Sequence, residues 1–266
     1  MPRKFLVAAL ALVVAVALAG VAYAANVYNI TQGATSPAGK GSKNKPLAKT
    51  LKFGYTVKDN AAPRGKPVNK YKIAIEGLSG KYAKFLPKCK YADANGTSHA
   101  TKCKKAKVGS GRVENLTGPG NNPNSNTFCN LKLTVYNLGT GLALRLDADP
   151  PAPTEQSGPI GCSIPIHQAI NAKFKTIKLD KIETSSLNFD VPLNLRHPGS
   201  PFLDNVVANT TATIKGKTKK VKIHGKKRKV GIYSALGCHG KNRTVSVSFS
   251  DESGKTTPIK VHTKKC

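Results

Sequence analysis

The sequence predicts an all-β fold: an antiparallel β-sandwich, built as one large or two smaller sandwich domains and held by disulfides. Three observations lead to this prediction. Apolar residues recur at every second position in short runs, turn-forming Gly, Pro and Asn separate the runs, and no stretch of a dozen residues after residue 24 has the apolar period of a helix. Short strands separated by turn-rich loops are typical of β-sandwiches.

Residues 1–24 have the pattern of a secretory signal peptide. Arg3 and Lys4 precede an apolar run from Phe5 to Val21, and Ala22-Tyr23-Ala24 has the small-x-small form of a cleavage site. An uncleaved signal anchor is the alternative, because the run approaches the roughly 17–25 residues that span a bilayer. We expect cleavage near Ala24, no membrane span in the mature chain, and a protein that is secreted or associated with the cell surface.

Strands are expected only after a linker. Residues 25–49 predict a disordered linker, because most of them are Gly, Ser, Pro, Lys or other small and polar residues. From Thr50 onward the apolar residues alternate, and each alternating run predicts a half-buried strand. The alternating runs are Leu51, Phe53 and Tyr55; Tyr71, Ile73 and Ile75; Leu131, Leu133 and Val135; Leu142, Leu144 and Leu146; Ile164 and Ile166; Leu187, Phe189 and Val191; and Val245, Val247 and Phe249, followed by Ile259 and Val261. Val206 to Ile214 is a run rich in β-branched residues and also predicts a strand.

Three hairpins follow from these runs. One joins residues 131–135 to 142–146 through Gly139 and Gly141, and one joins 245–249 to 259–261. A third is expected to pair Val221 and Ile223 with Val230 and Ile232 around a turn that contains Gly225.

The Pro- and Gly-rich segment 197–201 marks the best internal boundary. It divides a β-sandwich domain, residues 50–200, from a small basic sandwich-like domain, residues 201–266. In the alternative interpretation, residues 201–266 are the last strands of one larger fold.

The six cysteines indicate disulfides and an oxidising compartment, because their number is even and no Cys-x-x-Cys pair suggests zinc. Six cysteines allow 15 pairings. We expect pairing between neighbours in the sequence: Cys89 with Cys103, Cys129 with Cys162, and Cys238 with Cys266.

A short motif resembles a known group of proteins. Leu86-Pro87-Lys88-Cys89, then Cys103, then Lys107-Val108-Gly109-Ser110-Gly111, is similar to a Pro-x-Cys…Cys…Val-Gly-x-Gly arrangement in uncharacterised secreted β-rich proteins of actinobacteria. The final hairpin also looks like the terminal segment of those proteins. The resemblance implies a fold and a compartment, and it implies no activity.

Catalytic and metal-binding motifs are missing from the sequence. The six histidines are scattered without metal-ligand spacing, and no Gly-x-Ser-x-Gly elbow occurs. Asp147 and Asp149 could supply two calcium ligands, but few other acids are near them in the sequence, so a solvated strand end is favoured. We expect no catalytic residues, no metal and no cofactor.

The strongest functional signal is charge. Lys and Arg number 43 against 13 Asp and Glu, and the net charge of +30 falls only to +28 when Arg3 and Lys4 leave with the signal peptide. Anionic surface polymers are the partner this charge favours. The predicted polyanion-binding residues are Lys215, Lys217, Lys219, Lys220, Lys222, Lys226, Lys227, Arg228 and Lys229. A second basic cluster comprises Lys88, Lys90, Lys102, Lys104, Lys105 and Lys107.

The small numbers of Arg and aromatic residues restrict the class of partner. Only seven of the 43 basic residues are Arg, whose planar fork suits bidentate recognition of bases, and aromatic residues make up 6% with no Trp. Sequence-specific nucleic-acid binding and stacking on sugars are therefore disfavoured. Three alternatives stay open: edge lysines that only prevent aggregation, a secreted enzyme acting on an anionic substrate, and a protein-interaction module that lends an edge strand.

Overall fold

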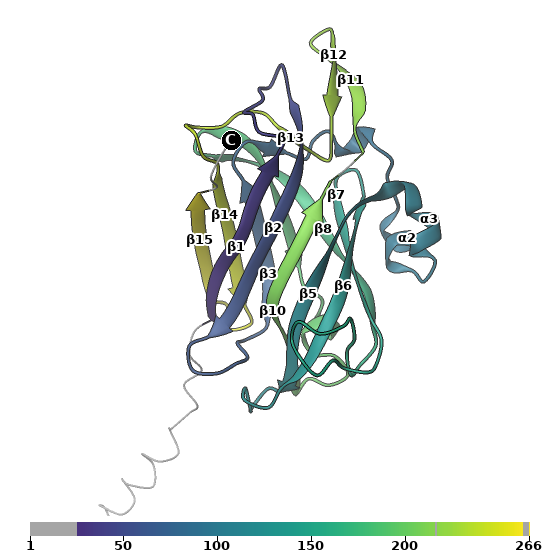
Figure 1. The fold of residues 1–266 in the computed structure, drawn as a ribbon, viewed down its shortest axis with the longest axis vertical. Coiled ribbons are helices and arrows are strands. Elements are labelled where there is room, and N and C mark those ends of the chain that lie inside the picture. The colour runs from purple at the N-terminus through teal and green to yellow at the C-terminus, as the bar shows by residue number, and fades with distance from the viewer. Residues whose placement is uncertain (1–25, 216, 263–265) are drawn as a thin grey trace, which may run out of the picture.

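The computed structural model describes residues 26–215, 217–262 and 266, and these are mostly β-strands (Figure 1). The predicted signal peptide lies outside the described residues. The strands are β1 (Asn26–Ser36), β2 (Leu47–Asp59), β3 (Val68–Ile75), β4 (Leu78–Ser79), β5 (Lys107–Pro119), β6 (Thr127–Asn137), β7 (Gly141–Ala148), β8 (Ile166–Leu179), β9 (Ile182–Asp190), β10 (Leu203–Ile214), β11 (Lys219–Ile223), β12 (Lys226–Val230), β13 (Tyr233–Ala235), β14 (Thr244–Asp251) and β15 (Thr256–His262).

One antiparallel sheet of 13 strands dominates the fold. Its order is β15-β14-β3-β9-β8-β7-β6-β5-β10-β2-β13-β4, with β1 also paired to β2, while β11 and β12 form a separate two-stranded sheet. The β prediction and two of the expected hairpins are confirmed, because Leu133 opposes Leu146 and Val247 opposes Ile259. Apolar alternation places one face of each strand in the core.

Aromatic side chains bring the two ends of the strand order together. The ring of Tyr28 on β1 stacks on that of Phe249 on β14 with centroids 4.2 Å apart, and the rings of Tyr55 on β2 and Tyr71 on β3 lie 5.8 Å apart. All four residues are buried. Figure 1 shows β1, β2, β10 and β5 side by side across the near side of the molecule. The sheet therefore bends around a core to which both of its ends contribute.

The prediction of a disordered linker over residues 25–49 is wrong. Asn26 to Ser36 form β1, which pairs along its length with β2, and β2 itself begins at Leu47. Only the first part of β1 alternates, with Asn26 and Tyr28 buried, whereas its second part is largely exposed. Backbone hydrogen bonds to β2 hold this polar segment in a strand, and side-chain composition does not reveal them.

Residues 201–266 share the main sheet with residues 50–200. β10 lies between β5 and β2, and β14 lies beside β3. The Pro- and Gly-rich segment at 197–201 connects the short helix α4 (Leu193–Arg196) to β10. These pairings agree with the interpretation of residues 201–266 as the last strands of one fold.

The three predicted disulfides are confirmed: Cys89–Cys103, Cys129–Cys162 and Cys238–Cys266. The first lies in a helical segment between β4 and β5 that the sequence did not predict. That segment contains η1 (Ala83–Phe85), α2 (Tyr91–Asn95), α3 (His99–Lys102) and η2 (Lys104–Ala106). Its helices are too short to show an apolar stripe.

Candidate functional site

The predicted polyanion-binding residues gather on and beside the β11–β12 hairpin, which projects from one end of the molecule (Figure 1). Its two-residue turn, His224-Gly225, has φ values of 45° and 77°, the positive-φ geometry that matches the twist of a tight hairpin. Ile223 therefore opposes Lys226 and Val221 opposes Arg228. The expected pairing of Val221 and Ile223 with Val230 and Ile232 is wrong, because the turn is shorter than that register requires.

The hairpin is attached by its apolar face. Val230 is buried in a cluster with Tyr82 and Leu236, and Val221 and Ile223 pack against this cluster. Lys220 and Lys222, which alternate with these apolar residues along β11, are exposed. The strand period thus separates an anchoring face from a charged face, as the sequence predicted.

On the charged face, lysines oppose lysines. Lys220 lies directly across from Lys229, and Lys222 lies directly across from Lys227. Directly opposed residues of an antiparallel pair have Cβ atoms about 4.5–5.5 Å apart, so like charges at these positions are destabilising. Among the described residues, none of the nine predicted cations at 215–229 makes an ion pair. The eight lysines of the set are exposed, and Arg228 is half-buried.

Carboxylates of the protein are engaged elsewhere. Glu183 pairs with Lys43 and Lys81 at 3.3 and 3.0 Å, and Glu114 pairs with Arg112 at 3.0 Å. These ion pairs use the carboxylates of Glu183 and Glu114 to neutralise cations that lie outside the hairpin. The charge of the hairpin therefore faces solvent without compensation from an ion pair.

Two other surfaces are basic. The six lysines of the cluster around Cys89–Cys103 are exposed, and Lys102 pairs with Asp93 at 3.5 Å. A shallow groove on the outer face of β3, β8, β9 and β14 is lined by lysines of β3 and β8 and by hydroxyl and amide side chains. The four lysines of this groove are Lys70, Lys72, Lys173 and Lys175. These four lysines are far apart in the sequence and come together only because β9 pairs with both β3 and β8.

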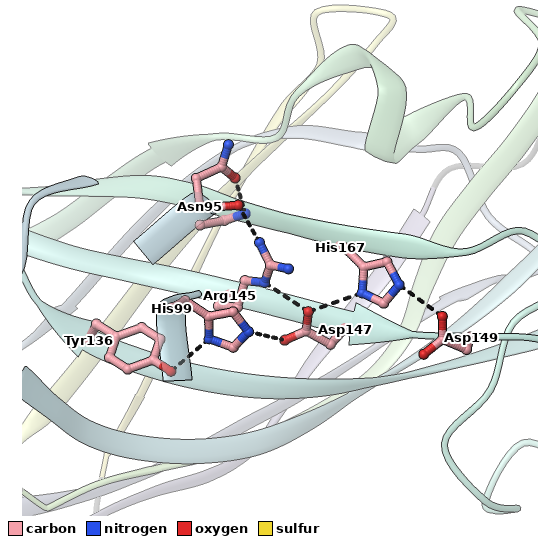
Figure 2. Close-up of polar contacts among 8 residues, drawn as sticks. Asn95, His99, Tyr136, Arg145, Asp147, Asp149 and His167 are labelled. Atoms are coloured by element: carbon pink, nitrogen blue, oxygen red, sulfur yellow. Dashed lines mark hydrogen bonds and ion pairs between the residues drawn. The ribbon is translucent and has the colours of Figure 1, made fainter. Parts of the chain in front are cut away.

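A polar network lies where α2 and α3 meet β7 and β8 (Figure 2). The Arg145 Nε donates to Asp147 Oδ1 at 2.8 Å. His167 places Nδ1 3.2 Å from Asp147 Oδ1 and Nε2 2.8 Å from Asp149 Oδ1. Only the protonated imidazolium donates from both nitrogens. Hydrogen bonds to Asp147 and then to Asp149 accordingly raise the pKa of His167 above its usual value.

His99 approaches the same carboxylate from α3. Its Nε2 lies 3.8 Å from Asp147 Oδ2, and its Nδ1 lies 2.8 Å from the hydroxyl of Tyr136. Burial, and next the charge of Arg145, lower the pKa of His99, whereas the charge of Asp147 opposes them. Two histidines beside one aspartate are thus shifted in opposite directions.

The network secures the disulfide-closed helical segment to the sheet. Arg145 Nη1 donates to the backbone oxygen of Asn95, the Asn95 side-chain oxygen accepts from the Ala169 N–H at 2.7 Å, and the Tyr91 hydroxyl donates to the Ala169 oxygen at 2.7 Å. These contacts satisfy buried backbone groups of β8 and of the C-terminal end of α2. Docking of the segment accounts for the arrangement.

For Asp147 and Asp149 the sequence favours a solvated strand end over a calcium pair, and it gives no link between them and His167. In the structure His167 is directly opposite Asp147 on the neighbouring strand, and it bridges both carboxylates. In the described part of the chain, no group of three or more His, Cys, Asp or Glu is placed to hold a metal ion. No helix within residues 26–215 and 217–262 is long and apolar enough to cross a membrane.

Comparison with protein-family models, with curated proteins and with solved structures returned no match in any of the three. The resemblance to secreted β-rich proteins of actinobacteria stays a prediction.

Proposed function

We propose that this chain is an exported, non-enzymatic β-sandwich protein that is held at the cell surface by electrostatic binding to polyanions. The β11–β12 hairpin is its principal binding surface. Its ligands are linear anionic polymers: a cell-wall polymer, an acidic polysaccharide or extracellular DNA.

The observation that carries the proposal is the pair of opposed lysines on each rung of the charged face, Lys220 with Lys229 and Lys222 with Lys227. A hairpin selected only for folding would place carboxylates opposite these lysines, because opposite charges at such positions are favourable. A polyanion supplies the missing negative charge and relieves the repulsion. Lysine, a compact point charge, suits such binding because it demands no bidentate geometry.

The setting of the hairpin supports the rest of the proposal. The contacts of Tyr28 with Phe249 and of Tyr55 with Tyr71 suit two packed layers of strands, as in a sandwich. Three disulfides are typical of proteins that fold in an oxidising compartment outside the cytoplasm. Export would expose the hairpin to anionic polymers of the cell surface.

The test is the salt concentration at which the mature chain elutes from immobilised heparin, a linear sulfated polymer. Wild type is compared with a variant in which Lys226, Lys227, Arg228 and Lys229 are all changed to Glu. We expect this variant to elute at much lower salt, because polyanion affinity falls steeply with ionic strength and depends on each cation in contact.

The matched control changes the four groove lysines, Lys70, Lys72, Lys173 and Lys175, to Glu. Both variants alter the net charge by the same amount; all the substituted positions are exposed except Arg228, which is half-buried. The hairpin variant should lose clearly more affinity than the groove variant. Equal losses would show that net charge alone governs binding and would overturn the assignment to the hairpin; circular dichroism checks that both variants are folded.

A further inference from the structure

The interior of the main sheet contains a cavity of about 120 Å³. It lies among the inward faces of β2, β3 and β5 to β10, so strands that are far apart in the sequence line it. The lining is largely apolar and aromatic, and it includes Val113, Leu131, Leu133 and the ring of Tyr71. Protein interiors are close-packed, and voids much larger than one water molecule are few. A cavity of this size destabilises a fold in proportion to its volume, so its presence needs a reason.

One wall of the cavity is polar, and its hydrogen bonds fix the orientation of an amide. Asn205 Nδ2 donates to the backbone oxygen of Leu195 at 2.7 Å, so Asn205 must present its oxygen to its other neighbours. Asn115 Nδ2 donates to that oxygen at 2.9 Å, and the Thr117 hydroxyl does the same at 2.9 Å. Because Asn115 directs its Nδ2 to Asn205, its Oδ1 is the atom of this group that has no hydrogen-bond partner among the described residues.

No donor in the described part of the protein satisfies Asn115 Oδ1, although the residue is only 3% exposed. A buried acceptor without a partner is costly, and such atoms in a native fold call for an explanation. Asn115 and Asn205 both line the cavity. A hydrogen-bond acceptor is thus fixed at the wall of a largely apolar chamber, whose other polar lining residues include Asn205 and Thr210.

We propose that this cavity is a binding site for a small, mainly apolar molecule that carries one hydrogen-bond donor: a single-ring compound of the phenol type. Apolar cavities of about 150 Å³ accept benzene, so a chamber of this size suits one ring. The ring contacts the aliphatic and aromatic walls, and its hydroxyl donates to Asn115 Oδ1. The site is independent of the charged hairpin, and it does not rest on polyanion binding.

Phenol and benzene are the probes, titrated into the folded mature chain and followed by isothermal calorimetry. We expect both to bind, and phenol to bind about 3- to 10-fold more tightly, the effect of one additional buried hydrogen bond. Nuclear Overhauser contacts between phenol protons and the methyl groups of Val113, Leu131 and Leu133 should place the ligand without any substitution.

Two variants test the parts of the proposal separately. Asn115→Leu removes the acceptor, so phenol should lose its advantage while benzene still binds. Val113→Phe fills the chamber and should abolish binding of both. The matched control is Asn171→Leu, the same substitution at an exposed position on the outer face of β8.

Three results would overturn the proposal. Neither probe binding wild type would remove the site. Equal affinities of phenol and benzene in wild type would remove the role of Asn115. Contacts of phenol with surface residues in place of the cavity methyl groups would move the ligand elsewhere, and this measurement decides the question even where a core variant fails to fold.

Discussion

The β11–β12 hairpin and the network around Asp147 arrange charges at close range in opposite ways. In the network, signs alternate: Arg145, Asp147, His167 and Asp149 follow one another at 2.8 to 3.2 Å. On the hairpin, Lys220 and Lys222 oppose lysines. In the network, each charge is paired with an opposite charge of the protein. On the hairpin, the opposed lysines have no such partner in the described part of the chain, so they are free to bind an external anion.

This difference shows how a strongly basic chain concentrates its charge. Several of its 13 acids lie beside Arg and His within the fold: Asp147 beside Arg145, and Glu252 beside Arg196 and His197. These pairs fasten a helical segment or a loop to the sheet. Lysines of the hairpin make no ion pair among the described residues, so uncompensated positive charge gathers on this projecting element, in addition to the two other basic surfaces.

The largest expected effect comes from removing the cation at the centre of the network. The Arg145 side chain is 3% exposed, and it donates to both Asp147 and the Asn95 backbone oxygen. Arg145→Met leaves a carboxylate and a carbonyl without that donor, so we expect a loss of about 3–5 kcal/mol, the usual result of breaking a buried pair. Thermal denaturation measures it, since each kcal/mol lowers Tm by roughly 2–4 °C at this chain length.

Arg228→Met on the hairpin is the matched control. It removes the same kind of side chain from a half-buried position with no ion pair, so no carboxylate loses its partner and the loss of stability should be well below that of Arg145→Met. Similar Tm losses in the two variants would contradict the distinction between a satisfied network and an uncompensated hairpin.

A smaller effect should depend on pH. The pKa of His167 is raised in the folded protein by its two aspartates, so its contribution to stability is complete below the unfolded value of about 6.5 and disappears as pH rises through the folded pKa. His167→Gln should therefore lower Tm at pH 5.5 and have little effect at pH 8.5. The ring is 42% exposed, so we expect only about 1–3 °C, as for a solvent-screened pair.

His99→Gln provides the opposite case. Burial lowers the pKa of His99, so the folded protein favours its neutral form, and its contribution is present above pH 6.5 and lost as pH falls. When Tm is plotted against pH, His167→Gln should differ from wild type at low pH, and His99→Gln should differ from it at high pH. Parallel curves would show that the two histidines do not differ in charge state.

Local features of this fold could be predicted, and features created by distant pairings could not. The β6–β7 and β14–β15 hairpins, the three disulfides and the cations at 215–229 join residues close in sequence. In contrast, β1 is held by its ladder with β2, since polar residues fill its second half.

The network and the cavity could not be predicted from the sequence, because both depend on pairings between strands that are distant in the sequence. Asp147 meets His167 only through the register of β7 and β8, which a long irregular connection separates. Asn115 meets Asn205 through the pairing of β5 with β10, almost a hundred residues apart in sequence. The alternation of β7 did show that Asp147 and Asp149 share a side of the strand, and this was the one available signal for the network.

The smallest expected effect tests the lysine pairs themselves. Lys222→Glu places a carboxylate directly across from Lys227, so repulsion becomes attraction on that rung. An opposed pair of opposite charges contributes roughly 0.2–1 kcal/mol, which should slow amide hydrogen exchange in β11 and β12 by about 1.4- to 5-fold. The same substitution should weaken heparin binding and make it less dependent on salt.

Lys219→Glu makes the same change in charge on the other face of β11, opposite Val230. It should reduce heparin binding without slowing hydrogen exchange, because it relieves no opposed lysine. If the two variants slowed exchange equally, the repulsion across the hairpin would be negligible and the charged face would lose its reason to recruit an anion. If only Lys222→Glu gained local stability while both lost affinity, then the hairpin gives up stability for binding, as the comparison with the Asp147 network implies.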